Sequence, residues 1–165
     1  MNQYQDLVDK LLSVGVATTQ TLAGCSELEI AQVQSSISGP MPRAYLEFLD
    51  VMGNGAGWLF QGSDIYFPDV LNCKNTAKEV IQTSDSGYKL APTAFVFYSH
   101  QGYQFIFFDT KDGDDPPVYR FQQSSYQPEL VDAQFSNWLS RCVDESCLSW
   151  PNYKEFLVKE GLVDI

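Results

Sequence analysis

The chain has 165 residues, of which 44% are hydrophobic, and it contains 11 Phe, 9 Tyr and 3 Trp. This length suits one domain, and the abundance of apolar and aromatic side chains excludes an intrinsically disordered chain. The 21 Asp and Glu residues outnumber the 10 Lys and Arg residues, which gives a formal net charge of -11. Because binding to nucleic acids and anionic lipids depends on basic side chains, this charge argues against both as direct partners. It favours encounter with a basic protein partner, with an acidic domain whose charge serves no partner as the alternative.

The first twelve residues contain neither a basic leader nor a long apolar segment, so they do not predict a secretory signal. No apolar run approaches the about 20 residues that are needed to cross a bilayer. The four cysteines, Cys25, Cys73, Cys142 and Cys147, lack C-x-x-C spacing and are predicted to be buried thiols. These features predict a cytoplasmic protein.

Three helices are predicted in the first third of the chain. The first is amphipathic, because apolar residues recur at helical spacing at Tyr4, Leu7, Val8, Leu11 and Leu12. Gly15 ends this helix, and a capping box formed by Ser26 and Glu29 begins the second. The third is predicted to begin at Pro42 and to end at residues 53–55, where two glycines flank an asparagine.

The rest of the chain is predicted to form a sheet and further helices. Aromatic and β-branched segments predict strands at residues 58–60, 65–67, 94–98, 104–109 and 118–121, with a hairpin turn at residues 100–102. Helices are predicted at residues 74–83, around residues 135–142, and at residues 152–160, the last opened by Pro151. This order predicts an α+β fold, in which a central, mainly antiparallel sheet is flanked by N-terminal and C-terminal helices.

The residues that could carry catalysis or bind a cofactor do not form a recognisable site. His100 is the only histidine, and it is predicted at a hairpin turn beside Ser99, where a nucleophile and its base are hard to hold together. The glycine-rich residues 53–57 follow a helix and precede a predicted strand, whereas phosphate-binding loops have the reverse order. The sequence therefore predicts no enzyme, no cofactor and no metal ion.

Acidic clusters leave two alternatives open. Residues 110–115 resemble the start of a calcium-binding EF-hand loop, but Thr110, Asp115 and Phe121 occupy the positions that need aspartate, glycine and glutamate. This loop is predicted to be a solvated turn, with a weak cation site or an acidic docking patch as alternatives. Carboxylate pairs such as Asp64 with Asp69 are interpreted as surface charge, with a carboxylate-based hydrolase as the alternative.

Three segments together resemble the SUKH superfamily, also called the Smi/Knr family. They are Gly24-Cys25-Ser26-Glu27-Leu28-Glu29-Ile30, Met41-Pro42-Arg43-Ala44-Tyr45-Leu46-Glu47-Phe48-Leu49, and Asn54-Gly55-Ala56-Gly57. The family's patterns are a helix that begins with a "t..eI" motif, a Leu-Pro-x-x-Tyr-x-x-Phe-Leu helix and an Asn-Gly-Gly turn. Met41 replaces the usual leucine, and Ala56 separates the two glycines. The motif positions assigned a structural role are Glu29, Pro42, Tyr45, Phe48, Leu49, Asn54, Gly55 and Gly57.

The resemblance covers about residues 4–143 of a single domain that spans residues 1–165. Residues 146–165 are expected to form an additional C-terminal helix, either as a packing helix or as a partner contact. The resemblance implies an α+β fold without a shared catalytic constellation. Many bacterial members are immunity proteins that bind and neutralise a cognate toxin, often a nuclease, and fungal relatives act in cell-wall regulation through protein contacts. The resemblance therefore implies a protein-binding domain that blocks a toxin by occlusion, with a regulatory or scaffold module that binds an endogenous protein as the alternative.

The partner-binding surface is predicted from acidic residues and aromatic side chains, because aromatic residues inside a charged rim concentrate binding energy. Trp58 is one predicted aromatic contact. The other predicted contact residues are Asp64, Tyr66, Asp69, Tyr103, Asp109, Asp112, Asp114 and Asp115.

Overall fold

The fold is built around a five-stranded antiparallel sheet in which each strand pairs with the next one along the chain. The computed structural model describes residues 1–163. The strands of this sheet are β3 (Ser63–Asp64), β4 (Ala94–His100), β5 (Gln104–Asp109), β6 (Val118–Gln122) and β7 (Glu129–Asp132). A second, two-stranded sheet joins β1 (Leu22–Ala23) to β2 (Gly55–Ala56).

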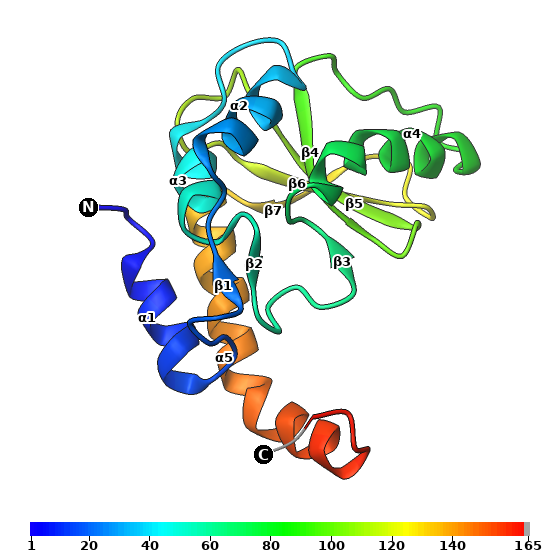
Figure 1. The fold of residues 1–165 in the computed structure, drawn as a ribbon. Helices are drawn as coiled ribbons and strands as arrows, with labels where there is room; N and C mark the ends of the chain where they lie inside the picture. Colours follow the sequence, from blue (N-terminus) through cyan, green and yellow to red (C-terminus); the bar gives the residue numbers. More distant parts are fainter. Residues whose placement is uncertain (164–165) are drawn as a thin grey trace.

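Helices surround the large sheet (Figure 1). They are α1 (Gln5–Val14), α2 (Glu27–Ser35), α3 (Arg43–Met52), the short 3-10 helix η1 (Asp69–Asn72), α4 (Cys73–Thr83) and α5 (Phe135–Lys159). In Figure 1, α4 lies in front of the sheet, and α5 runs from beneath α3 downwards past the sheet. The predicted α+β fold with an antiparallel sheet and flanking helices is confirmed.

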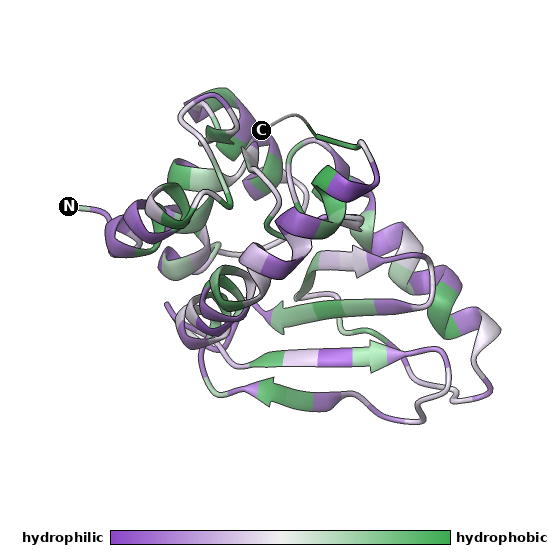
Figure 2. Cartoon of the chain, turned by 90° about the horizontal axis from the view of Figure 1, so that it is seen from below, coloured by the Kyte–Doolittle hydropathy of each residue, from purple (hydrophilic) through white to green (hydrophobic). Residues whose placement is uncertain are grey.

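Aromatic side chains fill both faces of the sheet, because successive residues of a strand point to opposite faces. Phe97 and Phe108 face α5, and the ring centroid of Phe97 lies 5.0 Å from that of Trp138. On the opposite face, Phe105 stacks on its cross-strand partner Phe121 with a centroid distance of 5.3 Å. Figure 2 shows long hydrophobic stretches in the strands and alternating hydrophobic and hydrophilic residues in the helices.

Tyr45 of α3 lies at the centre of the main core, where it is completely buried. Five phenylalanine rings surround it with centroids between 5.2 Å and 6.0 Å away, namely Phe48, Phe95, Phe97, Phe108 and Phe135. These rings come from α3, β4, β5 and α5, so one motif residue joins the sheet to two helices.

Most predicted elements are present. Gly15 adopts a left-handed conformation at the end of α1, and the Ser26–Glu29 capping box begins α2. Pro42 is the residue before α3 rather than its first helical residue. The predicted hairpin corresponds to β4 and β5, whereas β1 and β7 were not predicted.

Two predictions about elements were wrong. The predicted strands at residues 58–60 and 65–67 are absent, because residues 57–62 form a turn and the strands are β2 and β3 on either side of it. Gly57, Phe60 and Gly62 have positive φ angles, which an extended strand does not accommodate. The separate helix predicted at residues 152–160 is part of α5, which continues through Pro151 with Trp150 and Leu157 buried on either side of it.

No helix in the described part of the chain has both the length and the apolar character that a membrane span requires.

Candidate functional site

The three motif segments form one hydrogen-bonded unit, in which the backbone N–H of Cys25 donates to the Leu49 carbonyl at 2.8 Å. The Asn54 side-chain amide donates to the Glu29 carboxylate at 2.8 Å and to the Gly24 carbonyl at 3.3 Å. The same Glu29 carboxylate accepts the backbone N–H of Ser26 at 2.7 Å. This backbone hydrogen bond, together with bonds from the Ser26 and Asn54 side chains, lowers the pKa of Glu29. The capping box of α2 therefore also holds the turn that follows α3.

Two glycines allow the chain segments to approach closely at this turn. A Cβ atom on Gly24 would lie 1.7 Å from the Asp50 carbonyl oxygen, and a Cβ atom on Gly57 would lie 2.3 Å from the Val16 carbonyl oxygen. Gly57 also has a φ of +62°, a backbone angle that residues other than glycine rarely adopt. These contacts position the segment that leaves the turn, residues 58–62.

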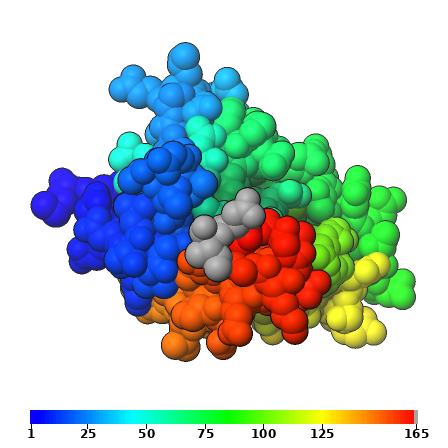
Figure 3. Space-filling model, turned by 60° about the horizontal axis from the view of Figure 1, so that its bottom comes forward, coloured from blue at the N-terminus to red at the C-terminus, as the bar shows by residue number. Residues whose placement is uncertain are grey.

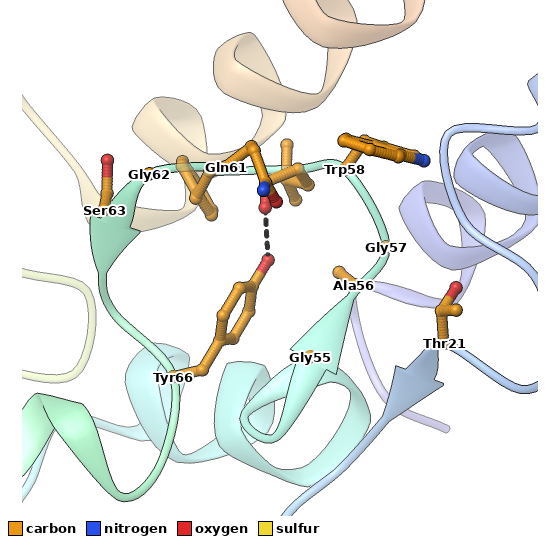
Figure 4. Close-up of a pocket in the computed structure, with 11 residues that line it drawn as sticks. Thr21, Gly55, Ala56, Gly57, Trp58, Gln61, Gly62, Ser63 and Tyr66 are labelled. Carbon is orange, nitrogen blue, oxygen red and sulfur yellow. Dashed lines mark hydrogen bonds between the residues drawn. The ribbon is translucent and has the colours of Figure 1, made fainter. Parts of the chain in front are cut away.

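Residues 58–62 form a surface loop with a groove on each side. The first groove has a volume of about 390 Å³ and is lined by this loop, Thr21 and Tyr66. The Tyr66 side chain reaches across this groove, and its hydroxyl donates to the Leu59 carbonyl at 2.8 Å, as Figure 4 shows. The second groove, of about 430 Å³, lies between the loop and α5 and includes Leu59, Phe60 and Glu145.

A row of aromatic side chains, of which Tyr153 and Phe156 are exposed, extends from this loop along the C-terminal half of α5. The ring of Trp58 lies 5.9 Å from those of Trp150 and Tyr153, and Tyr153 stacks on Phe156 at 6.3 Å. Tyr153 is 39% exposed and Phe156 is 51% exposed. We call Trp58, Trp150, Tyr153 and Phe156 the aromatic face. Figure 3 shows that the end of α5 lies beside the N-terminal part of the chain.

The predicted partner-binding residues fall into two groups at opposite ends of the β4–β5 hairpin. Asp64 pairs with Ser99 near the hairpin turn, and the ring of Tyr103 lies 5.6 Å from that of His100 in the same region. Tyr66 and Asp69 follow β3, but the Tyr66 hydroxyl is used internally. Asp109, Asp112, Asp114 and Asp115 lie beyond the other end, where Asp109 pairs with Ala94.

The acidic loop at residues 109–115 is held by its own hydrogen bonds. The Asp115 carboxylate accepts the backbone N–H of Ser136 at 2.9 Å and its hydroxyl at 2.5 Å, which caps the start of α5. The carbonyl of Asp114 accepts the N–H of Ala44 at 2.9 Å, near the start of α3. The loop therefore joins the starts of two helices, and the carboxylates of Asp112 and Asp114 remain exposed.

His100 contacts a serine other than the one beside it in the sequence. Its Nδ1 lies 2.8 Å from the Ser63 Oγ, which also donates to the Tyr98 hydroxyl at 2.8 Å. When Ser63 donates to Tyr98, His100 must donate to Ser63, which is opposite to the direction in which a base activates a serine. This network joins β3 to β4.

The cysteines and acidic residues show little sign of reactive or metal-binding chemistry. All four cysteines are free, and burial raises the pKa of Cys25 to about 11 and that of Cys73 to about 12. Because the thiolate is the reactive form, these shifts disfavour the reactive form of the two thiols at neutral pH. In residues 1–163, no three His, Cys, Asp or Glu side chains are grouped so that they could hold a metal ion.

The aromatic face was only partly predicted from the sequence. The sequence predicts Trp58 as a contact residue, whereas it leaves the segment with Trp150, Tyr153 and Phe156 as either an extra packing helix or a partner contact. Their spacing of three residues places them along one side of a helix, and this is the signal that identifies them. The closeness of Trp58 to this helix could not be read from the sequence, since 92 residues separate Trp58 from Trp150.

These features define an α+β domain with an aromatic face at the C-terminal end of α5. The profile of the SMI1 / KNR4 family (SUKH-1) matches residues 24–141, and the chain belongs to this family. No curated protein matches the chain. The part of α5 that carries Trp150, Tyr153 and Phe156 lies outside the matched residues.

A solved structure supports the fold. The crystal structure of an uncharacterized protein from Salmonella enterica subsp. enterica serovar typhimurium str. 14028s is similar, with a TM-score of 0.51 and 13% sequence identity. The similarity covers 86% of this chain and 77% of that chain. At this identity, the similarity concerns the fold alone.

Proposed function

We propose that this chain is a non-catalytic protein-binding domain that acts as an immunity protein in the cytoplasm. It binds a cognate toxin, such as a nuclease, and blocks the toxin's active surface by occlusion. The observation that carries the proposal is the aromatic face, because Tyr153 and Phe156 are exposed on a well-packed helix of an acidic molecule.

The packing of the aromatic face suits binding to another protein. Trp150 is buried and Trp58 is half-buried, and both rings contact Tyr153. The exposed rings therefore rest on fixed neighbours. Aromatic side chains with few rotatable bonds lose little conformational entropy on binding and dominate the energetics of many interfaces.

The net charge of -11 supports a basic partner. A nuclease domain presents a basic surface to nucleic acid, and an acidic protein is attracted to this surface during encounter. In this proposal, the edge of the binding surface on the side of β3 is formed by Asp64, Asp69 and Tyr103. The second group of predicted contact residues, at positions 109–115, lies at the far end of the hairpin, and this proposal assigns it no contact with the toxin.

Capture of the partner from the native host tests this proposal. The tagged chain is used at low and at high salt, and the proteins that it retains are identified by mass spectrometry. We expect a basic toxin domain whose recovery falls at high salt, and whose toxic activity the purified chain inhibits. A partner that is a housekeeping or signalling protein, with no toxin inhibited, would instead support the regulatory or scaffold function.

A further inference from the structure

A separate pocket lies next to the acidic loop, on the face of the large sheet that is opposite to α5. Its volume is about 340 Å³, and its lining includes Tyr88, Ala94, Phe107, Asp109, Asp112 and Tyr119. It shares no lining residue with the two grooves beside residues 58–62.

The pocket has an apolar floor and aromatic walls. Phe107 and Tyr119 are cross-strand partners of β5 and β6, and their ring centroids lie 5.7 Å apart with an angle of 27° between the planes. Tyr88 is held from outside the sheet by stacking on Phe121 at 5.4 Å. Two cross-strand rings and a third ring on a fixed support form a site that is preorganised for a flat or slender group.

Two carboxylates give the pocket a negative charge. The Asp109 carboxylate is fixed by the Thr93 hydroxyl at 3.0 Å and by the Lys111 backbone N–H at 3.0 Å. Asp112 is exposed, and neither aspartate forms an ion pair within residues 1–163. Lys74 of α4 donates to the backbone carbonyls of Pro92 and Ala94.

The negative charge and the aromatic walls of the pocket determine which chemical group it can bind. The faces of aromatic rings and the carboxylates all attract positive charge, so an anion is repelled and a neutral group leaves the carboxylates without a partner. A metal ion would need more oxygen ligands than two carboxylates beside hydrocarbon walls provide. A guanidinium group satisfies both features, because it stacks on aromatic rings and donates in a planar fork to carboxylates.

We propose that this pocket binds the guanidinium group of an arginine side chain presented by another protein. The arginine side chain lies against Tyr88 and Tyr119, and its guanidinium donates to Asp109 and Asp112. This inference is independent of the aromatic face, and either one can fail without the other.

The test is an NMR titration of the full chain with the peptide Ac-Gly-Arg-Gly-amide. The matched probe replaces arginine with citrulline, which has nearly the same shape but no charge. We expect amide shifts at Ala94, Phe107, Asp112 and Tyr119, and affinity at least about tenfold weaker for the citrulline peptide, because charge-assisted hydrogen bonds are lost. Equal affinity for the two peptides would overturn the proposal.

Variants separate the pocket from the general acidity of the molecule. The double variant Asp109→Asn with Asp112→Asn should weaken binding of the arginine peptide at least about tenfold, and Tyr119→Leu should weaken it about two- to fivefold. The control variant Asp6→Asn with Glu27→Gln changes the charge equally at exposed positions outside the pocket and should leave affinity nearly unchanged. Asp112→Asn alone serves if the double variant fails to fold. Shifts spread over the acidic surface, or equal losses in the control, would contradict the assignment.

Discussion

At the scale of single residues, the hydrogen bond between Asn54 and Glu29 joins the capping box of α2 to the turn after α3. The pKa of Glu29 is lowered in the folded state, mainly by the N–H of Ser26. This carboxylate therefore stabilises the folded protein at pH values above its unfolded pKa, and the stabilisation is lost as the pH falls through the lower pKa of the folded state.

Replacing Asn54 with aspartate should therefore destabilise the protein in a pH-dependent manner. At pH 7, Asn54→Asp places a second negative charge against Glu29, whereas at pH 4 one of the two carboxylates can hold a proton. We expect a lower urea midpoint for the variant, with a larger loss at pH 7 than at pH 4. Asn152→Asp, at an exposed position of α5, is the control. Equal losses at the two pH values would show that Glu29 and position 54 do not interact.

The turn after α3 also requires a glycine at position 57. Gly57→Ala combines a left-handed φ of +62° with a Cβ atom 2.3 Å from the Val16 carbonyl oxygen. Gly87→Ala is the matched control, because Gly87 has a φ of +65° but no atom within 4 Å of the added Cβ. We expect Gly87→Ala to cost about 1 kcal/mol and Gly57→Ala about 3 kcal/mol, measured by chemical denaturation. Equal losses would mean that the close approach to Val16 is unimportant.

At the scale of elements, the acidic loop at residues 109–115 supports the helices next to it. Asp115 caps α5 across a sequence gap of 21 residues, and a carboxylate near a helix N-terminus also interacts favourably with the helix dipole. Asp115 is predicted from the sequence to bind a partner, and the structure gives its carboxylate an internal role in addition.

Asp115→Ala should lower the free energy of unfolding by about 1–2 kcal/mol, because the first turn of α5 loses its cap. Asp114→Ala is the control, since the Asp114 side chain is exposed and its contact with Ala44 is made by the backbone carbonyl. We expect a change below about 0.5 kcal/mol for the control. Urea denaturation measures both values, and equal effects would contradict the capping role of Asp115.

The elements that were predicted correctly have strong local signals. The capping box at Ser26 and Glu29 and the dense aromatic residues of β4 and β5 depend on neighbours in the sequence. Residues 58–60 misled the prediction, because aromatic residues that fill the space beside a turn have the same composition as a strand. The short strand β7 has two exposed residues among its four, so it carries little hydrophobic periodicity.

At the scale of the whole molecule, the candidate site depends on contacts that the sequence does not encode locally. Trp58 meets Trp150 only because the motif turn and the uninterrupted helix α5 bring them together. Asp64 and Asp115 are both acidic and both were predicted as contacts, yet they lie near opposite ends of the same hairpin. Residue type therefore predicted the kind of surface, and tertiary structure determined which residues share it.

The most direct test of the protein-binding account is to measure, by isothermal titration calorimetry, the affinity of variants of this chain for the captured partner. For Tyr153→Ala with Phe156→Ala we predict a dissociation constant at least about tenfold higher, because exposed aromatic residues of a binding surface carry much of the binding energy. Tyr126→Ala removes a more exposed aromatic ring, 72% exposed in the β6–β7 loop, and should leave the affinity unchanged. An unchanged affinity for the double variant would contradict the assignment of the aromatic face as the binding surface.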